Sequence, residues 1–159
     1  MNQGEYSKYY LYPGSLFADR QPYYITTLLG SCVSVCLYDR RQHIGGMNHF
    51  LLPMWNGKGL ASPKYGNIAV QQLVERMHQL GSRTPDLIAK VFGGASVLES
   101  QNNVFFIGDR NIRIVQELLE KEMHIKIVAS STGGNLGRKI VFDTLTGEVR
   151  QKYLGNGKT

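Results

Sequence analysis

Runs of largely apolar residues occupy much of the first third of the chain, and they are typical of β-strands. In one segment Val33, Val35 and Leu37 lie on one face of the predicted strand, while Ser34 and Cys36 lie on the other. β-Branched and aromatic residues are frequent in these segments, which favours the same interpretation. Three strands are therefore expected, over residues 23–29, 33–38 and 44–52.

Further along, apolar residues recur every three to four positions, as they do on the buried face of an amphipathic helix. Val70, Leu73, Val74 and Met77 form one such stripe. Helices are expected over residues 65–80 and 109–123, and further strands over 87–92, 125–129, 139–143 and 148–153.

The predicted order of elements is β-β-β-α-β-α-β-β-β. Hairpins at both ends and only two main helices favour an α+β layered sandwich with mixed or antiparallel sheets over a doubly wound parallel sheet. Residues 1–22 are aromatic and polar, and we expect them to pack on the rest of the chain as an arm with a short strand. No repeat or linker divides the sequence, so residues 1–159 are expected to form a single domain.

Composition excludes several classes of function. The net charge is +6, but the 18 Lys and Arg residues are dispersed, which argues against a nucleic-acid-binding protein. No apolar stretch approaches the ~18–20 residues of a membrane helix, and the first residues do not resemble a secretory leader. We therefore expect no membrane insertion and a cytoplasmic location. No His, Cys, Asp and Glu cluster has the spacing of a metal site.

Cys32 is the residue best suited to nucleophilic chemistry. It follows Gly30 and Ser31 at the junction of two predicted strands. Glycine permits a sharp turn that leaves the thiol at a strand end, with backbone N–H groups free to face an oxyanion. Gly30 and Ser31 are thus expected to support an oxyanion site. The alternative is a buried structural cysteine, the commoner environment of a free thiol and the interpretation that we favour for Cys36.

His49 is the best candidate for a base, because it lies in a strand-like run that is expected to neighbour the strand after Cys32. An imidazole there can take the thiol proton. The alternative is a histidine satisfied within the core. Thr26 or its neighbour Thr27 can accept the second imidazole proton and fix the tautomer. The remaining histidines lie in settings less suited to catalysis, and these are His43, His78 and His124.

Several short motifs follow one another along nearly the whole chain, each weak alone and specific in combination. They are Leu29-Gly30-Ser31-Cys32-Val33, Met47-Asn48-His49-Phe50-Leu51-Leu52-Pro53, Lys64-Tyr65-Gly66, Lys90-Val91-Phe92-Gly93-Gly94-Ala95, Ile107-Gly108-Asp109-Arg110-Asn111, Thr132-Gly133-Gly134-Asn135 and Gly137-Arg138-Lys139. In this order they resemble the CheD family of chemoreceptor glutamine deamidases of bacterial chemotaxis.

The resemblance implies a three-layer α/β/β sandwich and a Cys-His-Thr triad on Cys32, His49 and Thr26. Thr26 is chosen over Thr27 because it stands six positions before the cysteine, as the family pattern requires. The implied reaction is conversion of glutamine to glutamate through a thioester on Cys32, without a cofactor. Methyl-accepting chemotaxis receptors are the implied protein substrates, and a CheC-type phosphatase is a further implied partner. The alternative is a regulatory module that binds these partners with catalysis secondary or lost.

Overall fold

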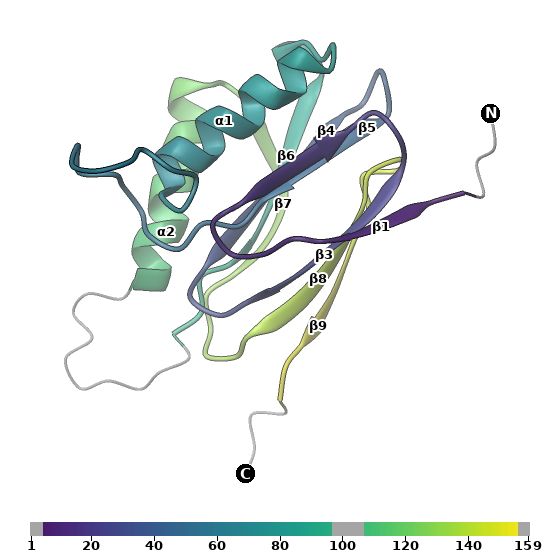
Figure 1. Ribbon diagram of the computed structural model, residues 1–159. Helices are drawn as coiled ribbons and strands as arrows, with labels where there is room; N and C mark the ends of the chain where they lie inside the picture. The colour runs from purple at the N-terminus through teal and green to yellow at the C-terminus, as the bar shows by residue number, and fades with distance from the viewer. Residues whose placement is uncertain (1–4, 97–106, 156–159) are drawn as a thin grey trace.

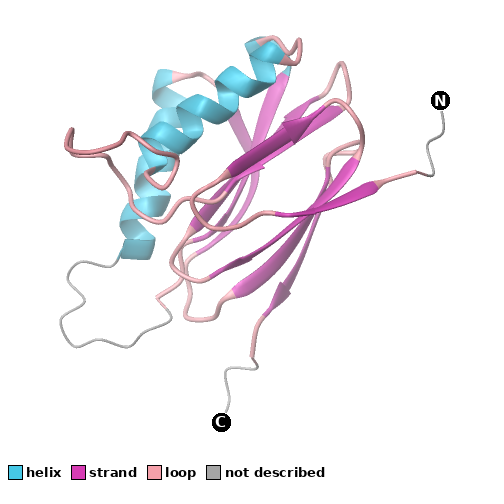
Figure 2. Ribbon diagram, viewed as in Figure 1, coloured by secondary structure: helices cyan, strands magenta, loops and turns pink. Residues whose placement is uncertain are grey.

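The computed structural model describes residues 5–96 and 107–155, and these fold into three layers (Figure 1). Two helices cover one face of a five-stranded sheet, and a four-stranded sheet packs on its other face (Figure 2). The expected three-layer α/β/β sandwich with mixed sheets is confirmed. None of the helices in the described part of the chain is long and apolar enough to cross a membrane.

The five-stranded sheet has the order β2-β5-β4-β6-β7. Its strands are β2 (Leu16–Asp19), β5 (Ile44–Asn48), β4 (Val33–Asp39), β6 (Leu87–Gly93) and β7 (Lys126–Thr132). Every residue of the central β4 is buried, because one face meets the helices and the other meets the second sheet. Successive side chains therefore enter two different cores: Val33, Val35 and Leu37 pack under the helices, while Cys36 packs between the sheets.

The four-stranded sheet has the order β1-β3-β8-β9. Its strands are β1 (Ser7–Tyr10), β3 (Tyr23–Leu29), β8 (Arg138–Asp143) and β9 (Val149–Tyr153). In β3, Ile25, Thr27 and Leu29 are buried toward the five-stranded sheet, and the residues between them are more exposed. This alternation decides which threonine reaches the interior.

The helical layer holds α1 (Gly66–Gln79) and α2 (Ile107–Gln116), and α2 continues into the π-helical turn η3 (Glu117–Glu122). A short 3₁₀ turn, η1 (Thr84–Asp86), precedes β6. Val70, Leu73, Val74 and Met77 of α1 are buried, as their spacing predicts. The packing of this layer on β4 and β6 forms the larger of the two cores.

Two details differ from the sequence prediction. The arm contains two strands rather than one, and they join different sheets, with β1 parallel to β3 and β2 antiparallel to β5. β5 ends at Asn48 rather than Leu52. β5 ends where the Asn48 side-chain Oδ1, in place of a backbone carbonyl, accepts the Val35 N–H at 2.7 Å. Beyond Asn48 the pairing continues only as isolated bridges, such as Val33 with Phe50.

Candidate active site

Cys32 closes the tight connection between β3 and β4. Two backbone hydrogen bonds from the residues after β6 hold this connection. Gly94 donates its N–H to the Cys32 carbonyl at 2.8 Å, and Ala95 donates its N–H to the Gly30 carbonyl at 2.9 Å. Cys32 is partly exposed, whereas Cys36 is fully buried. Of the two thiols, only that of Cys32 is therefore open to a reagent or substrate.

Gly93 explains why a glycine pair follows β6. Its φ is +110°, and a Cβ atom there would overlap the carbonyl oxygen of Cys32. Only glycine combines this backbone conformation with so close an approach. The glycine pair thus serves the Cys32 turn directly.

His49 lies just beyond the end of β5, and two backbone hydrogen bonds to the segment before β2 hold it. Its N–H donates to the Ser15 carbonyl at 3.1 Å, and its carbonyl accepts the Gly14 N–H at 2.8 Å. The antiparallel register runs from Cys36 opposite Met47 to Val33 opposite Phe50. The same register sets His49 opposite Ser34 and diagonal to Cys32, on the sheet face that looks toward β3. The structure thus brings Cys32 and His49 to neighbouring positions on one face.

A chain of hydrogen bonds fixes the state of the His49 ring. The Thr27 hydroxyl donates to the Leu11 carbonyl at 2.6 Å, and it lies 2.7 Å from His49 Nδ1. A hydroxyl has one proton to give. Because that proton goes to Leu11, the Thr27 oxygen accepts from His49, so Nδ1 carries the ring proton. The Nε2 atom then keeps its lone pair, and it has no hydrogen-bond partner among the described residues.

The structure brings Thr27, not Thr26, into contact with His49. Thr26 points with Tyr24 and Leu28 to the outer face of the four-stranded sheet, away from His49. Thr27 is fully buried and makes the contact. The threonine that contacts His49 thus stands five residues before Cys32, not six. The Leu11 carbonyl was not foreseen, because a backbone group leaves no signal in the sequence.

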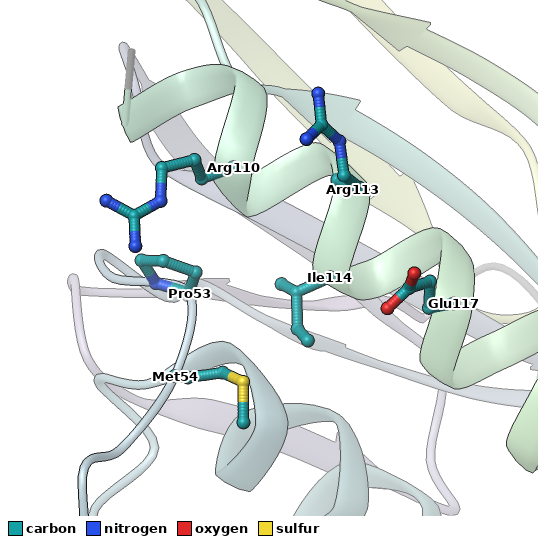
Figure 3. A pocket seen from close by; sticks show the side chains of 6 residues that line it. All are labelled: Pro53, Met54, Arg110, Arg113, Ile114 and Glu117. Atoms are coloured by element: carbon teal, nitrogen blue, oxygen red, sulfur yellow. The ribbon is translucent and has the colours of Figure 1, made fainter. Parts of the chain in front are cut away.

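A surface hollow lies between α2 and the loop after β5 (Figure 3). Met54 and Ile114 approach it from the loop after β5 and from α2, and Arg110 lies beside Pro53 at one end (Figure 3). Neither Cys32 nor His49 lines it. Within residues 5–96 and 107–155, Arg110 and Arg113 form no ion pair with an acidic side chain. The hollow is therefore lined by two guanidinium groups and one carboxylate, that of Glu117.

Comparison with known protein families matches residues 51–153 to the family described as "CheD chemotactic sensory transduction". This match covers well over half of the chain. The chain belongs to the CheD family. The matched range begins after Cys32 and His49, so it carries no information on their roles.

Curated relatives agree with this membership. A "Probable chemoreceptor glutamine deamidase CheD" of Trichlorobacter lovleyi is 51% identical over 151 residues, which cover 95% of this chain and 91% of the relative. Proteins of the same description from Sulfurimonas denitrificans and Rhodospirillum rubrum are 50% and 46% identical over 152 residues each. These alignments cover 94% and 96% of this chain, and 96% and 85% of the respective relatives.

In this CheD-family chain, burial favours the neutral forms of both candidate residues. Desolvation lowers the pKa of His49 from 6.5 to about 4. Burial also raises the pKa of the Cys32 thiol, although the backbone N–H of Cys32 opposes this by hydrogen bonding to the sulfur. The pair therefore rests as thiol and neutral imidazole, not as the thiolate–imidazolium pair of strongly activated cysteines. Cys36 is buried among apolar side chains, and its pKa is raised further by desolvation.

Proposed function

We propose that this chain is a chemoreceptor glutamine deamidase, in which Cys32 is the nucleophile, His49 the general base and acid, and Thr27 the residue that orients His49. The observation that carries the proposal is the tautomer of His49. Its Nδ1–H is committed to Thr27, so the unpartnered Nε2 is the basic atom, on the sheet face that Cys32 shares. A cysteine acyl-transfer reaction needs such a basic nitrogen to take the proton of the thiol.

The reaction begins from the neutral pair. His49 Nε2 removes the thiol proton as the Cys32 sulfur attacks the side-chain amide carbon of glutamine, forming a tetrahedral oxyanion. The imidazolium returns its proton to the amide nitrogen, the C–N bond breaks, and ammonia leaves a thioester on Cys32. His49 then removes a proton from water, which attacks the thioester. Collapse of the second oxyanion releases glutamate and the thiol, so no cofactor is consumed.

The backbone N–H of Cys32 is placed to stabilise the oxyanion. Among the described residues it donates to no backbone carbonyl, and it belongs to the residue that carries the proposed nucleophile. An N–H aimed at developing negative charge stabilises the transition state more than the ground state. Gly30 and Ser31 support it by forming the turn in which this N–H is directed outward.

The surface beside the hollow suits a substrate that carries carboxylates. Arg110 and Arg113 are exposed there, and the chain carries a net charge of +6. A glutamate-rich helix of a chemoreceptor would bring negative charge close to these guanidinium groups while a neighbouring glutamine reaches Cys32. Such charge complementarity raises the association rate and selects among partners. Because the receptor segments in question are cytoplasmic, the proposed location of the enzyme is the cytoplasm.

The direct test is to incubate the purified chain with the cytoplasmic fragment of a chemoreceptor and to follow the glutamines by mass spectrometry. Conversion of particular glutamines to glutamates, with release of ammonia, supports the proposal. Binding of the fragment, or of a CheC-type phosphatase, without any conversion would favour the regulatory binding module instead. The CheC-type partner itself stays a prediction.

A further inference from the structure

Asn111 links the two halves of the candidate active site through one buried side chain. It lies on α2, is fully buried, and its Nδ2 donates to two backbone carbonyls at 3.0 Å each. One carbonyl belongs to Ser31, which directly precedes Cys32, and the other belongs to Leu51, two residues after His49. A single amide group therefore ties the cysteine turn to the histidine strand.

The close approach of α2 makes this contact possible. Gly108 lies one helical turn before Asn111, on the same face of α2, and both are buried. A Cβ atom at Gly108 would overlap the carbonyl oxygens of Gly94 and Ala95. The helix can thus rest directly on the backbone that supports the Cys32 turn. From this distance the short side chain of asparagine reaches the Ser31 carbonyl.

The contact with Ser31 controls the direction of the Cys32 N–H. The Ser31 carbonyl and the Cys32 N–H belong to one planar trans peptide, so they point in opposite directions. Holding the carbonyl toward α2 turns the N–H away from α2 and toward the thiol. Rotation of this peptide would remove the N–H from the place where the oxyanion forms.

We propose that Asn111 is a positioning residue that fixes the Ser31–Cys32 peptide so that the Cys32 N–H acts as the oxyanion donor. The proposal rests on the deamidase function above. Asn111 touches neither the substrate nor the thiol, and it acts only through the peptide that it holds. Its amide is required because both acceptors are carbonyl oxygens, to which only the NH₂ group can donate.

The test distinguishes a loss of oxyanion stabilisation from a loss of thiol reactivity. Deamidation passes through an oxyanion, whereas alkylation of Cys32 by iodoacetamide displaces iodide and forms none. For Asn111→Ala and the milder Asn111→Ser we expect kcat for deamidation of a receptor fragment to fall, by about 100-fold for alanine, the scale of a small misplacement of reacting groups. KM should stay close to that of wild type. Alkylation of Cys32 should slow far less than deamidation, because it loses only the effect of the Cys32 N–H on the thiol pKa and no oxyanion donor.

Ser82→Ala is the matched control. Ser82 is also buried and donates to Asp39 at 2.6 Å, at the opposite end of β4. Its loss should lower the thermal stability without changing kcat. The proposal is overturned if the Asn111 variants keep full kcat, if kcat and alkylation fall together, or if Ser82→Ala loses kcat to the same degree. Absence of deamidation by the wild type would instead overturn the proposed function itself, and this inference with it.

Discussion

Replacing Thr27 by valine should disable the candidate site while leaving the sheet intact. Valine has the shape of threonine and a high strand propensity, so the substitution removes the hydroxyl with little change in packing. Two hydrogen bonds disappear, to the Leu11 carbonyl and from His49 Nδ1. Both groups then lie unsatisfied in the interior, since Leu11 is fully buried and His49 is 2% exposed.

The magnitudes follow from these contacts. Each buried polar group left without a partner costs about 1–3 kcal/mol, so the free energy of unfolding should fall by roughly 2–4 kcal/mol. Activity should fall because the ring is no longer held with its proton on Nδ1. Loss of a residue that orients a functional histidine typically costs about 10- to 100-fold. Thr27→Ser keeps the hydroxyl and should recover most of the activity.

Thr26→Val is the matched control, because Thr26 is adjacent in sequence but points to the other face of the sheet. The assay compares the rate of glutamine conversion in a receptor fragment, together with urea unfolding, for the two valine variants. Thr27→Val should be impaired in both and Thr26→Val in neither. The reverse pattern, with Thr26→Val inactive and Thr27→Val active, would refute the assignment of the orienting residue.

Three further predictions concern the thiols, pH and substrate binding. Iodoacetamide should label Cys32 much faster than Cys36, because Cys32 is partly exposed and Cys36 is buried with a raised pKa; equal rates in the native protein would contradict this. Acid should destabilise the fold through His49, since its pKa of about 4 lies below the ordinary 6.5 and the unfolded chain therefore binds the proton first. Between pH 7 and pH 5 this should lower the free energy of unfolding by about 2 kcal/mol, a loss that urea titrations of His49→Asn should not show. The double variant Arg110→Gln, Arg113→Gln should raise KM for an acidic receptor fragment at low salt and leave kcat unchanged. A KM that changes neither with these substitutions nor with salt would contradict the proposed docking role.

The fold could largely be predicted because its elements carry strong local patterns. The stripe on α1 is buried as its spacing predicts, and β4 is a strand where one was expected, although it is buried on both faces. The pairing of the arm was harder, because β1 and β2 belong to different sheets and nothing in their composition distinguishes the two. The end of β5 depends on a single side chain, Asn48, that replaces a backbone acceptor.

The sequence points to the candidate residues of the site but not to the contacts that support them. Cys32 and His49 could be selected from residue type and setting. The family pattern selected Thr26, and the apolar pattern of β3 could not test that choice, since both faces of β3 carry apolar residues. Leu28 is 45% exposed and Leu29 only 1%, a difference that arises from the packing of the second sheet. The contributions of Leu11 and Asn111 arise from long-range packing, which one sequence does not reveal.

The rate of glutamine conversion by Cys32→Ala and Cys36→Ala, measured side by side on one chemoreceptor fragment, tests the central claim most directly. The account predicts that Cys32→Ala falls to the background rate while still binding the fragment. Cys36→Ala should keep the wild-type rate despite a lower thermal stability. Conversion at the wild-type rate by Cys32→Ala would contradict the assignment of Cys32 as the nucleophile.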